Sequence, residues 1–214
     1  MTKVVKFFKI ALYKCEGEII NYFMGEVYKR SQSEILENQL SEFLKKNGFR
    51  LDNETDIISI CEKLNLSAFY ASLDELNVDG FILVNENHRV IGIDEKLSAL
   101  DARFLIAHEL GHYITEVKDK QPSEVLIAAK DKLYHGKEKS SHEHDMDYLA
   151  AAILVPKNQF IWELKALDIN FGTLHSEEEV RKNIQPDLIA FFAKRYRVKE
   201  QLIVRRIAEV SYYA

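Results

Sequence analysis

The stretch LIAHELGHYI, residues 105–114, decides how the rest of the chain is interpreted. His108 and His112 lie one helical turn apart, so both imidazoles leave the same face of a helix and can hold one Zn²⁺ between them. Glu109 is rotated around the helix, where its carboxylate can take a proton from a water molecule that attacks a carbonyl. The alternative is a core helix that carries two histidines and no metal.

A zinc ion held by two histidines needs a third protein ligand. One class of zinc peptidases takes it from a histidine six residues further on, but that residue is Lys118 here, and Thr115 stands where that class has glycine. A carboxylate from a second helix is the alternative. HEHDMDYLAAA, residues 142–152, offers Glu143 as the ligand, with Asp147 four residues later to accept the N–H of a ligating histidine.

Other residues near Glu143 compete for the role of third ligand. They are His142, His144 and Asp145. The two histidines lie about 100° of helix to either side of Glu143, so neither faces the ion if Glu143 does. Glu116, one turn beyond His112, lies about 12 Å along the axis from His108 and cannot share its metal. We expect Glu116 to be solvated.

The composition describes an ordinary globular chain of 214 residues, with 47% hydrophobic and 29% charged residues. Its net charge of −5 argues against a surface built mainly for nucleic acid. Cys15 and Cys61 form no CxxC pair, which favours reduced thiols in a cytoplasmic protein. Lysines interrupt the apolar N-terminus, so it does not read as a signal peptide, and no apolar run is long enough to cross a membrane.

The pattern of apolar residues predicts an α+β fold that is mainly helical. Helices are expected within 3–47, with Ser33 capping the second of them, and at 55–66, 98–117, 140–156 and 157–167, with two more in the tail. Strands are expected at 67–73, 81–84 and 89–93, the last two forming a hairpin. A looser, lysine-rich connection at 117–140 has room for a short helix at 123–133. We divide the chain into an N-terminal helical extension (1–50), a metallopeptidase core (51–165) and a C-terminal helical segment (166–214).

DARFLIAHELGHYI followed by EHDMDYLAAAILVP resembles the ImmA/IrrE metallopeptidases over about residues 55–210. The matching positions are Arg103, Phe104, Ala107, His108, Glu109, Gly111, His112, Glu143, Asp147, Ala150 and Pro156. Met146 and Leu149 depart from the family's alanine and phenylalanine, but both are apolar. The resemblance implies a zincin-like core with a small sheet or hairpin packed on the HExxH helix.

The resemblance also implies a function. Such proteins cut or antagonise a helix-turn-helix repressor of a mobile element or stress regulon. We therefore predict a zinc-dependent endopeptidase in which His108, His112 and Glu143 hold Zn²⁺, Glu109 is the general base, and Asp147 orients a histidine. The alternative is a metal-containing anti-repressor or toxin–antitoxin type regulator that binds its partner without cutting it.

Several further residues are candidates for supporting roles. A donor to the oxyanion could come from Tyr113, Tyr148, His142, His144 or His175. Arg103, on the metal helix, is expected to form a structural ion pair. The tail carries a basic cluster that could contact DNA, although a solvated helix face is the simpler interpretation. Its members are Lys194, Arg195, Arg197, Lys199, Arg205 and Arg206.

Overall fold

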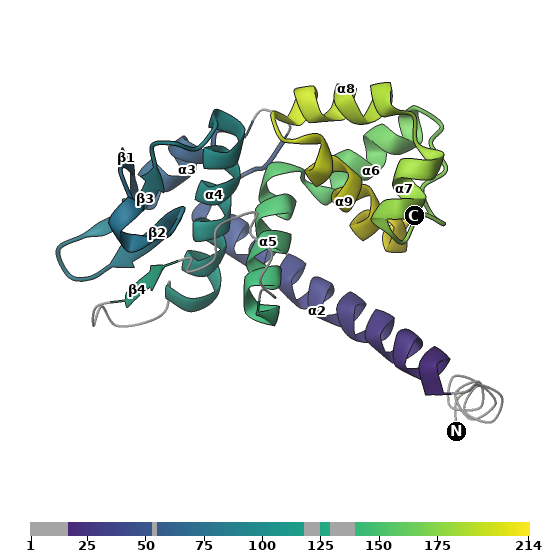
Figure 1. Ribbon diagram of the computed structural model, residues 1–214, viewed down its shortest axis with the longest axis horizontal. Helices are drawn as coiled ribbons and strands as arrows, with labels where there is room; N and C mark the ends of the chain where they lie inside the picture. The colour runs from purple at the N-terminus through teal and green to yellow at the C-terminus, as the bar shows by residue number, and fades with distance from the viewer. Residues whose placement is uncertain (1–16, 53–54, 118–124, 129–139) are drawn as a thin grey trace. The chain divides into compact units, whose positions relative to one another are not determined.

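The computed structural model describes the backbone of residues 17–52, 55–117, 125–128 and 140–214, and the side chains of 32–52, 55–117 and 140–214 (Figure 1). The chain divides into two compact units, Met1–Leu36 and Glu37–Ala214. The described residues of the first unit form the beginning of helix α2, Gly17–Asn47. The rest of α2 belongs to the second unit. The predicted division at residues 50 and 165 stays a prediction.

Helix α2 runs without a break through the position where we expected a second helix to begin. Ser33 lies inside it, so the predicted N-cap at Ser33 is wrong. The predicted C-terminal end is confirmed, because α2 has two lysines in its last turn and Gly48 follows with a φ of 69°. The part of the expected first helix at 3–16 lies outside the described residues, as does Cys15. Cys61 is a free, fully buried thiol.

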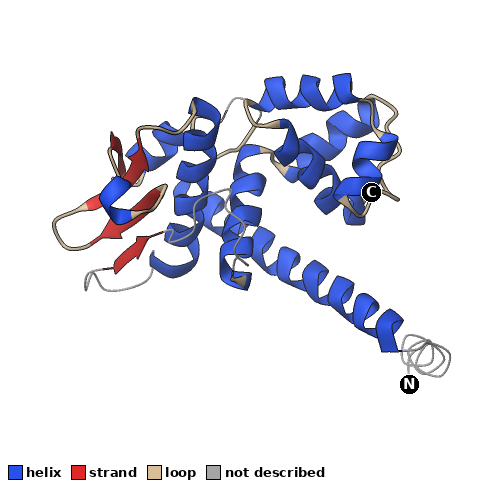
Figure 2. Cartoon of the chain, in the orientation of Figure 1, coloured by secondary structure: helices blue, strands red, loops and turns tan. Residues whose placement is uncertain are grey.

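The second unit is mainly helical with one small mixed sheet, which confirms the α+β class (Figure 2). Beyond α2, the helices of the described residues are α3 (Ile57–Lys63), α4 (Ala99–His112), α5 (Ser141–Leu154), α6 (Lys157–Ala166), α7 (Glu177–Asn183), α8 (Pro186–Tyr196) and α9 (Glu200–Val210). Three short turns are η1 (Asp74–Leu76), the π-helical η2 (Tyr113–Val117) and η3 (Ser211–Tyr213). No helix in these ranges has the length and apolarity needed to cross a bilayer.

The sheet contains β1 (Ser67–Ala71), β2 (Gly80–Val84), β3 (Arg89–Asp94) and β4 (Val125–Ala128) in the order β1-β3-β2-β4. The predicted hairpin is confirmed: β2 and β3 pair antiparallel, and the fully buried Ile82 lies opposite the fully buried Ile91. Strand β1 joins β3 in parallel. Strand β4 pairs with β2, so the short helix expected at 123–133 is wrong for residues 125–128.

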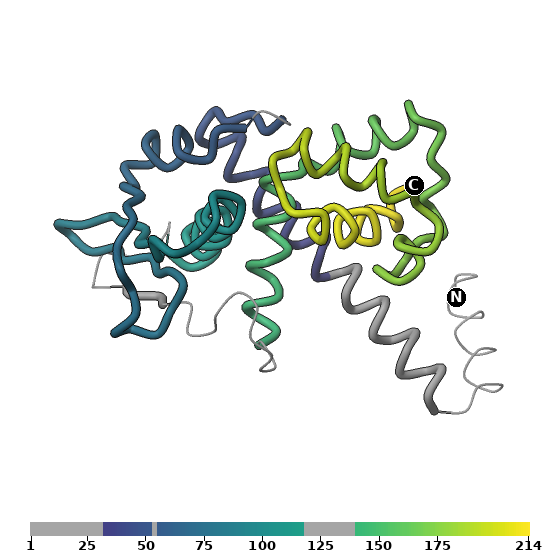
Figure 3. Tube along the Cα trace, turned by 45° about the horizontal axis from the view of Figure 1, so that its top comes forward, coloured from purple at the N-terminus to yellow at the C-terminus, as the bar shows by residue number. Residues whose placement is uncertain are grey.

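Helix α4 contacts β2 and β3 on one side and α5 on the other, and Figures 1 and 3 both show α4 beside α5. Every residue from Leu105 to His112 is buried, so all faces of this part of the helix pack against other elements. Gly111 allows the close approach of α5. A Cβ there would lie 3.3 Å from the Met146 sulfur and 3.4 Å from Leu149 Cβ. The metal motif is therefore held inside the core.

Helices α6 to α9 follow α5, and α9 contacts α5, α7 and α8. The turn between α8 and α9 falls at Arg197, which has a left-handed φ of 53°. Arg206, on α9, is fully buried. Its guanidinium donates to the Val155 carbonyl at 3.0 Å, to Glu37 at 3.0 Å and to Glu209 at 3.1 Å. This member of the basic cluster therefore belongs to the protein interior.

Candidate metal centre

Two helices bring the three predicted metal ligands together. His108 and His112 project from α4 and are 2% and 1% exposed, with ring centroids 5.1 Å apart. Glu143 comes from the first turn of α5. One carboxylate oxygen lies 3.1 Å from His108 Nε2, and the other lies 3.7 Å from His112 Nε2. These three side chains form a group that could hold a metal ion.

The sequence places Glu143 at a well-defined helix start. Ser140 caps α5 with its hydroxyl, which accepts a hydrogen bond from the Glu143 backbone N–H. Glu143 is thus in the first turn, where the positive end of the helix dipole stabilises a carboxylate. Ser98 caps α4 in the same way by accepting from the Asp101 N–H. The two caps fix where each ligand leaves its helix.

Several buried atoms at this centre lack the partners that buried polar atoms normally have. Within the described residues, His112 Nε2 and both carboxylate oxygens of Glu109 are buried and accept or donate no hydrogen bond. Such atoms are rare in folded proteins and need an explanation. A cation next to the His112 nitrogen and a polar molecule next to Glu109 would satisfy them. The donor set of two imidazoles and one carboxylate therefore fits a metal ion, and zinc in particular.

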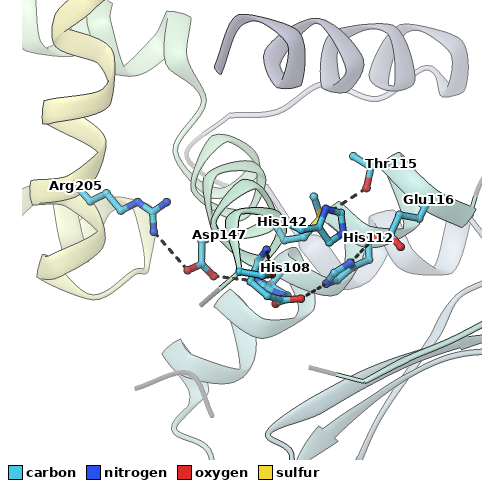
Figure 4. Close-up of polar contacts among 10 residues, drawn as sticks. His108, His112, Thr115, Glu116, His142, Asp147 and Arg205 are labelled. Carbon is cyan, nitrogen blue, oxygen red and sulfur yellow. Dashed lines mark hydrogen bonds and ion pairs between the residues drawn. The ribbon is translucent and has the colours of Figure 1, made fainter. Parts of the chain in front are cut away.

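Asp147 lies one turn after Glu143 and contacts His108 at Nδ1, the ring nitrogen that does not contact Glu143. Its carboxylate is 3.0 Å from His108 Nδ1, which is the contact expected from the sequence. Arg205 of α9 lies 3.6 Å from the other oxygen of Asp147, so Asp147 sits between Arg205 and His108 (Figure 4). A carboxylate only accepts hydrogen bonds, so it fixes the ring proton on Nδ1 and leaves Nε2 for a ligand.

The carboxylates and the burial of the site shift the pKa values of its members. Burial opposes protonation of His108, but hydrogen bonds to Asp147 and Glu143 outweigh it and raise the pKa to about 9. The hydrogen bond to His108 lowers the pKa of Glu143, which stays ionised. Burial raises the pKa of Glu109 to about 8. A carboxyl with a pKa near neutrality can take up and release protons, as a general acid–base group must.

Glu116 is only partly exposed and is hydrogen-bonded to two histidines, so the expectation of a solvated side chain was wrong. Its Oε1 lies 2.6 Å from His112 Nδ1 and 2.6 Å from His142 Nε2 (Figure 4). Burial disfavours the charged form of Glu116, but these two hydrogen bonds lower its pKa overall. As expected from its distance to His108, Glu116 does not join the group formed by His108, His112 and Glu143. Its spacing of four residues from His112 could have revealed the contact.

The remaining candidates lie elsewhere or have other partners. His142 is about half exposed and bonds to Glu116, while His144 is exposed and lines a hollow of about 270 Å³ with Asp147 and Arg205. Within the described residues, the possible ligand groups near α5 contain neither His144 nor Asp145. The contact of Arg205 with Asp147 was not predicted, since no local signal links α9 to Asp147.

Four further candidates have other interaction partners. The Tyr148 hydroxyl donates to Glu37 at 3.1 Å, and His175 bonds to Ser211 at 2.8 Å. Tyr113 is buried with its ring edge against Phe43. Arg103 donates to the Thr55 carbonyl at 2.9 Å. The structural ion pair expected for Arg103 is not found within the described residues.

Comparison with known proteins shows the family to which the chain belongs. The model of the IrrE N-terminal-like domain family, Peptidase_M78, matches residues 61–208, which is more than half of the chain. The matched range contains α4, α5 and all the residues of the metal centre. Among curated proteins, no match was found.

Proposed function

Since the chain belongs to the IrrE N-terminal-like domain family of metallopeptidases, we propose that it is a zinc-dependent endopeptidase that cleaves one specific protein. The observation that carries the proposal is the convergence of His108, His112 and Glu143 beside a fully buried carboxyl, Glu109, that has no hydrogen-bond partner within the described residues. His108, His112 and Glu143 would hold the ion. When bound, Zn²⁺ supplies Lewis acidity, which makes a water molecule acidic enough to lose a proton near pH 7.

Glu109 is the residue we propose to move the proton. It neighbours His108 on α4 but is not part of the ligand group, so its carboxylate remains available to a water molecule. It would accept the proton of the attacking water and then deliver it to the leaving amine. Burial raises the pKa of Glu109 to about 8, and a cation bound beside it would favour the ionised form that accepts the proton. A chain that only needed to hold a metal would have no use for a carboxyl here, which favours catalysis over binding alone.

Asp147 and Arg205 would support this chemistry without touching the substrate. Asp147 holds His108 by its Nδ1 at 3.0 Å, and Arg205 holds the second oxygen of Asp147 at 3.6 Å. Partners of this kind keep a ligating imidazole in one tautomer and one orientation. The zinc ligands would thus be prearranged before substrate arrives, which favours a well-defined coordination geometry.

The substrate we propose is a helix-turn-helix repressor of a mobile element or stress regulon. This step rests on the resemblance of the two sequence motifs, because a site alone does not name a protein substrate. A regulatory peptidase that cut proteins in general would harm the cell that makes it. The proposal therefore commits to a single partner, and a gene for a small helix-turn-helix protein beside this one would support it.

The test is to incubate the purified zinc-loaded chain with the repressor encoded beside its gene and to analyse the products by mass spectrometry. We expect one new pair of peptide ends, and we expect a chelator of zinc to prevent their formation. DNA binding by the repressor is followed in parallel. If the repressor leaves its DNA while it remains intact, the chain acts by binding and the peptidase proposal fails.

A further inference from the structure

Each histidine of the centre contacts a carboxylate through its Nδ1: His108 contacts Asp147, and His112 contacts Glu116. No role has yet been assigned to Glu116. We propose that Glu116 is a positioning residue that fixes the ring of His112 for metal binding, as Asp147 does for His108. The inference rests on the proposed function in one respect, since it takes His112 to be a metal ligand. It goes further by making Glu116 a determinant of metal affinity that lies outside the ligand group.

The geometry at the two histidines is closely parallel. Glu116 Oε1 is 2.6 Å from His112 Nδ1, and Asp147 Oδ1 is 3.0 Å from His108 Nδ1. In each case the acceptor can only receive a hydrogen bond, so the proton resides on Nδ1. Both Nε2 atoms then lie on the side of Glu143, 3.1 Å and 3.7 Å from its carboxylate oxygens, where a bound metal ion would take them as ligands.

Local structure explains how Glu116 reaches His112. Immediately after His112 the α-helix gives way to the π-helical turn η2, Tyr113–Val117, which carries Glu116. Thr115 helps hold this turn, because its hydroxyl donates to the Gly111 carbonyl at 3.0 Å. Such π-turns are rare and often occur at functional sites. The carboxylate of Glu116 is therefore placed by a specific backbone feature rather than by a flexible surface helix.

A second contact holds Glu116 from the opposite helix. His142, in the first turn of α5 and next to Glu143, lies 2.6 Å from the same oxygen of Glu116. The Glu116 carboxylate thus joins the end of α4 to the start of α5, the two segments that carry the ligands. Its side chain is 26% exposed and that of His142 is 48% exposed, so the bridge lies at the outer edge of the centre.

The same three residues, His112, Glu116 and His142, could instead hold a second cation. That arrangement would require Nδ1 of His112 to bind one ion while Nε2 binds the other. The ring would then have to lose the protons of both nitrogens, whereas a neutral imidazole ligand keeps one of them. The hydrogen-bonded arrangement needs no such loss. The proposal accordingly commits to one ion per chain.

The test measures Zn²⁺ affinity by competition with a chromophoric chelator, for the whole chain and for matched variants. We expect Glu116→Ala to weaken Zn²⁺ binding about 10- to 100-fold. Glu116→Gln should lose less, because its amide oxygen still accepts the Nδ1–H hydrogen bond. His142→Ala, which leaves the His112 contact intact, should also lose less than Glu116→Ala. Glu86→Ala removes an exposed carboxylate from the β2–β3 turn and should bind like the wild type.

Thermal unfolding of the metal-free variants separates positioning from a structural role. We expect Glu116→Ala to melt close to the wild type without metal and to differ in its zinc affinity. Unchanged affinity in Glu116→Ala, or a lowered metal-free Tm with unchanged affinity, would overturn the inference, and so would two ions bound per chain. Failure of the wild type itself to bind zinc would instead count against the proposed function.

Discussion

Replacing Glu109 by glutamine is expected to lower kcat/KM for repressor cleavage by about 10²- to 10⁴-fold, the usual contribution of a general base. Glutamine has nearly the same shape but cannot accept the proton of the attacking water. Zinc should remain bound with little change in affinity, because Glu109 is not among the three side chains grouped as possible ligands. Cleavage rates and zinc content measured on the same samples check both parts of the expectation.

A matched substitution controls for the loss of a carboxylate as such. Glu86→Gln makes the same chemical change at an exposed position in the turn after β2 and should cleave at the wild-type rate. If Glu109→Gln relieves repression as well as the wild type while cutting nothing, the alternative of a regulator that acts by binding is correct. If Glu109→Gln still cuts at more than a tenth of the wild-type rate, another group must be the base.

The second large effect is expected in stability. Arg206→Ala should lower the free energy of unfolding by about 3–5 kcal/mol, the cost of removing one partner from a buried ion pair. Arg206 is fully buried, and both Glu37 and Glu209 contact it at about 3 Å. Its loss would leave Glu37 with the Tyr148 hydroxyl and the more distant Lys157, and Glu209 with Arg205. The Val155 carbonyl at the end of α5 would also lose its donor. Urea unfolding followed by circular dichroism measures the change.

An exposed pair provides the comparison for this stability prediction. Arg181 lies 4.0 Å from Glu177 on the surface of α7, and Arg181→Ala should cost less than about 1 kcal/mol. A loss of less than about 1 kcal/mol in Arg206→Ala would mean that the buried network stabilises the fold no more than a surface pair does. Unfolding midpoints should shift with the slope unchanged if the transition remains two-state.

The sequence was sufficient where a local signal decided the structure. The 3.6-residue apolar period of α4 and α5 and the hairpin at 80–94 are properties of neighbouring residues. The meeting of Glu143 with His108 also followed, because two histidines at helical spacing need a third ligand and residues 142–152 offer few candidates. The ligand roles themselves remain predictions.

The expectations that were wrong concerned partners distant in the sequence, or a local preference that the fold overrides. Residues 125–128 form a strand because they pair with the edge of β2. The spacing of apolar residues within 123–133 gives no information about that distant edge. Arg206 belonged by composition to a basic surface cluster, but it lies in the interior against Glu37. Ser33 has the chemistry of a cap, but α2 continues through it. Glu116 was assigned to solvent, although a π-turn directs it back to His112.

The central claim is that one zinc ion is held by two imidazoles of α4 and the Glu143 carboxylate of α5. Zinc-edge X-ray absorption on the wild type and on Glu143→Ala tests it most directly. We predict one ion per chain with two imidazole nitrogens at about 2.0–2.1 Å, and a carboxylate oxygen that disappears in the variant. An unchanged absorption spectrum in Glu143→Ala, or any number of imidazole ligands other than two, would contradict the claim.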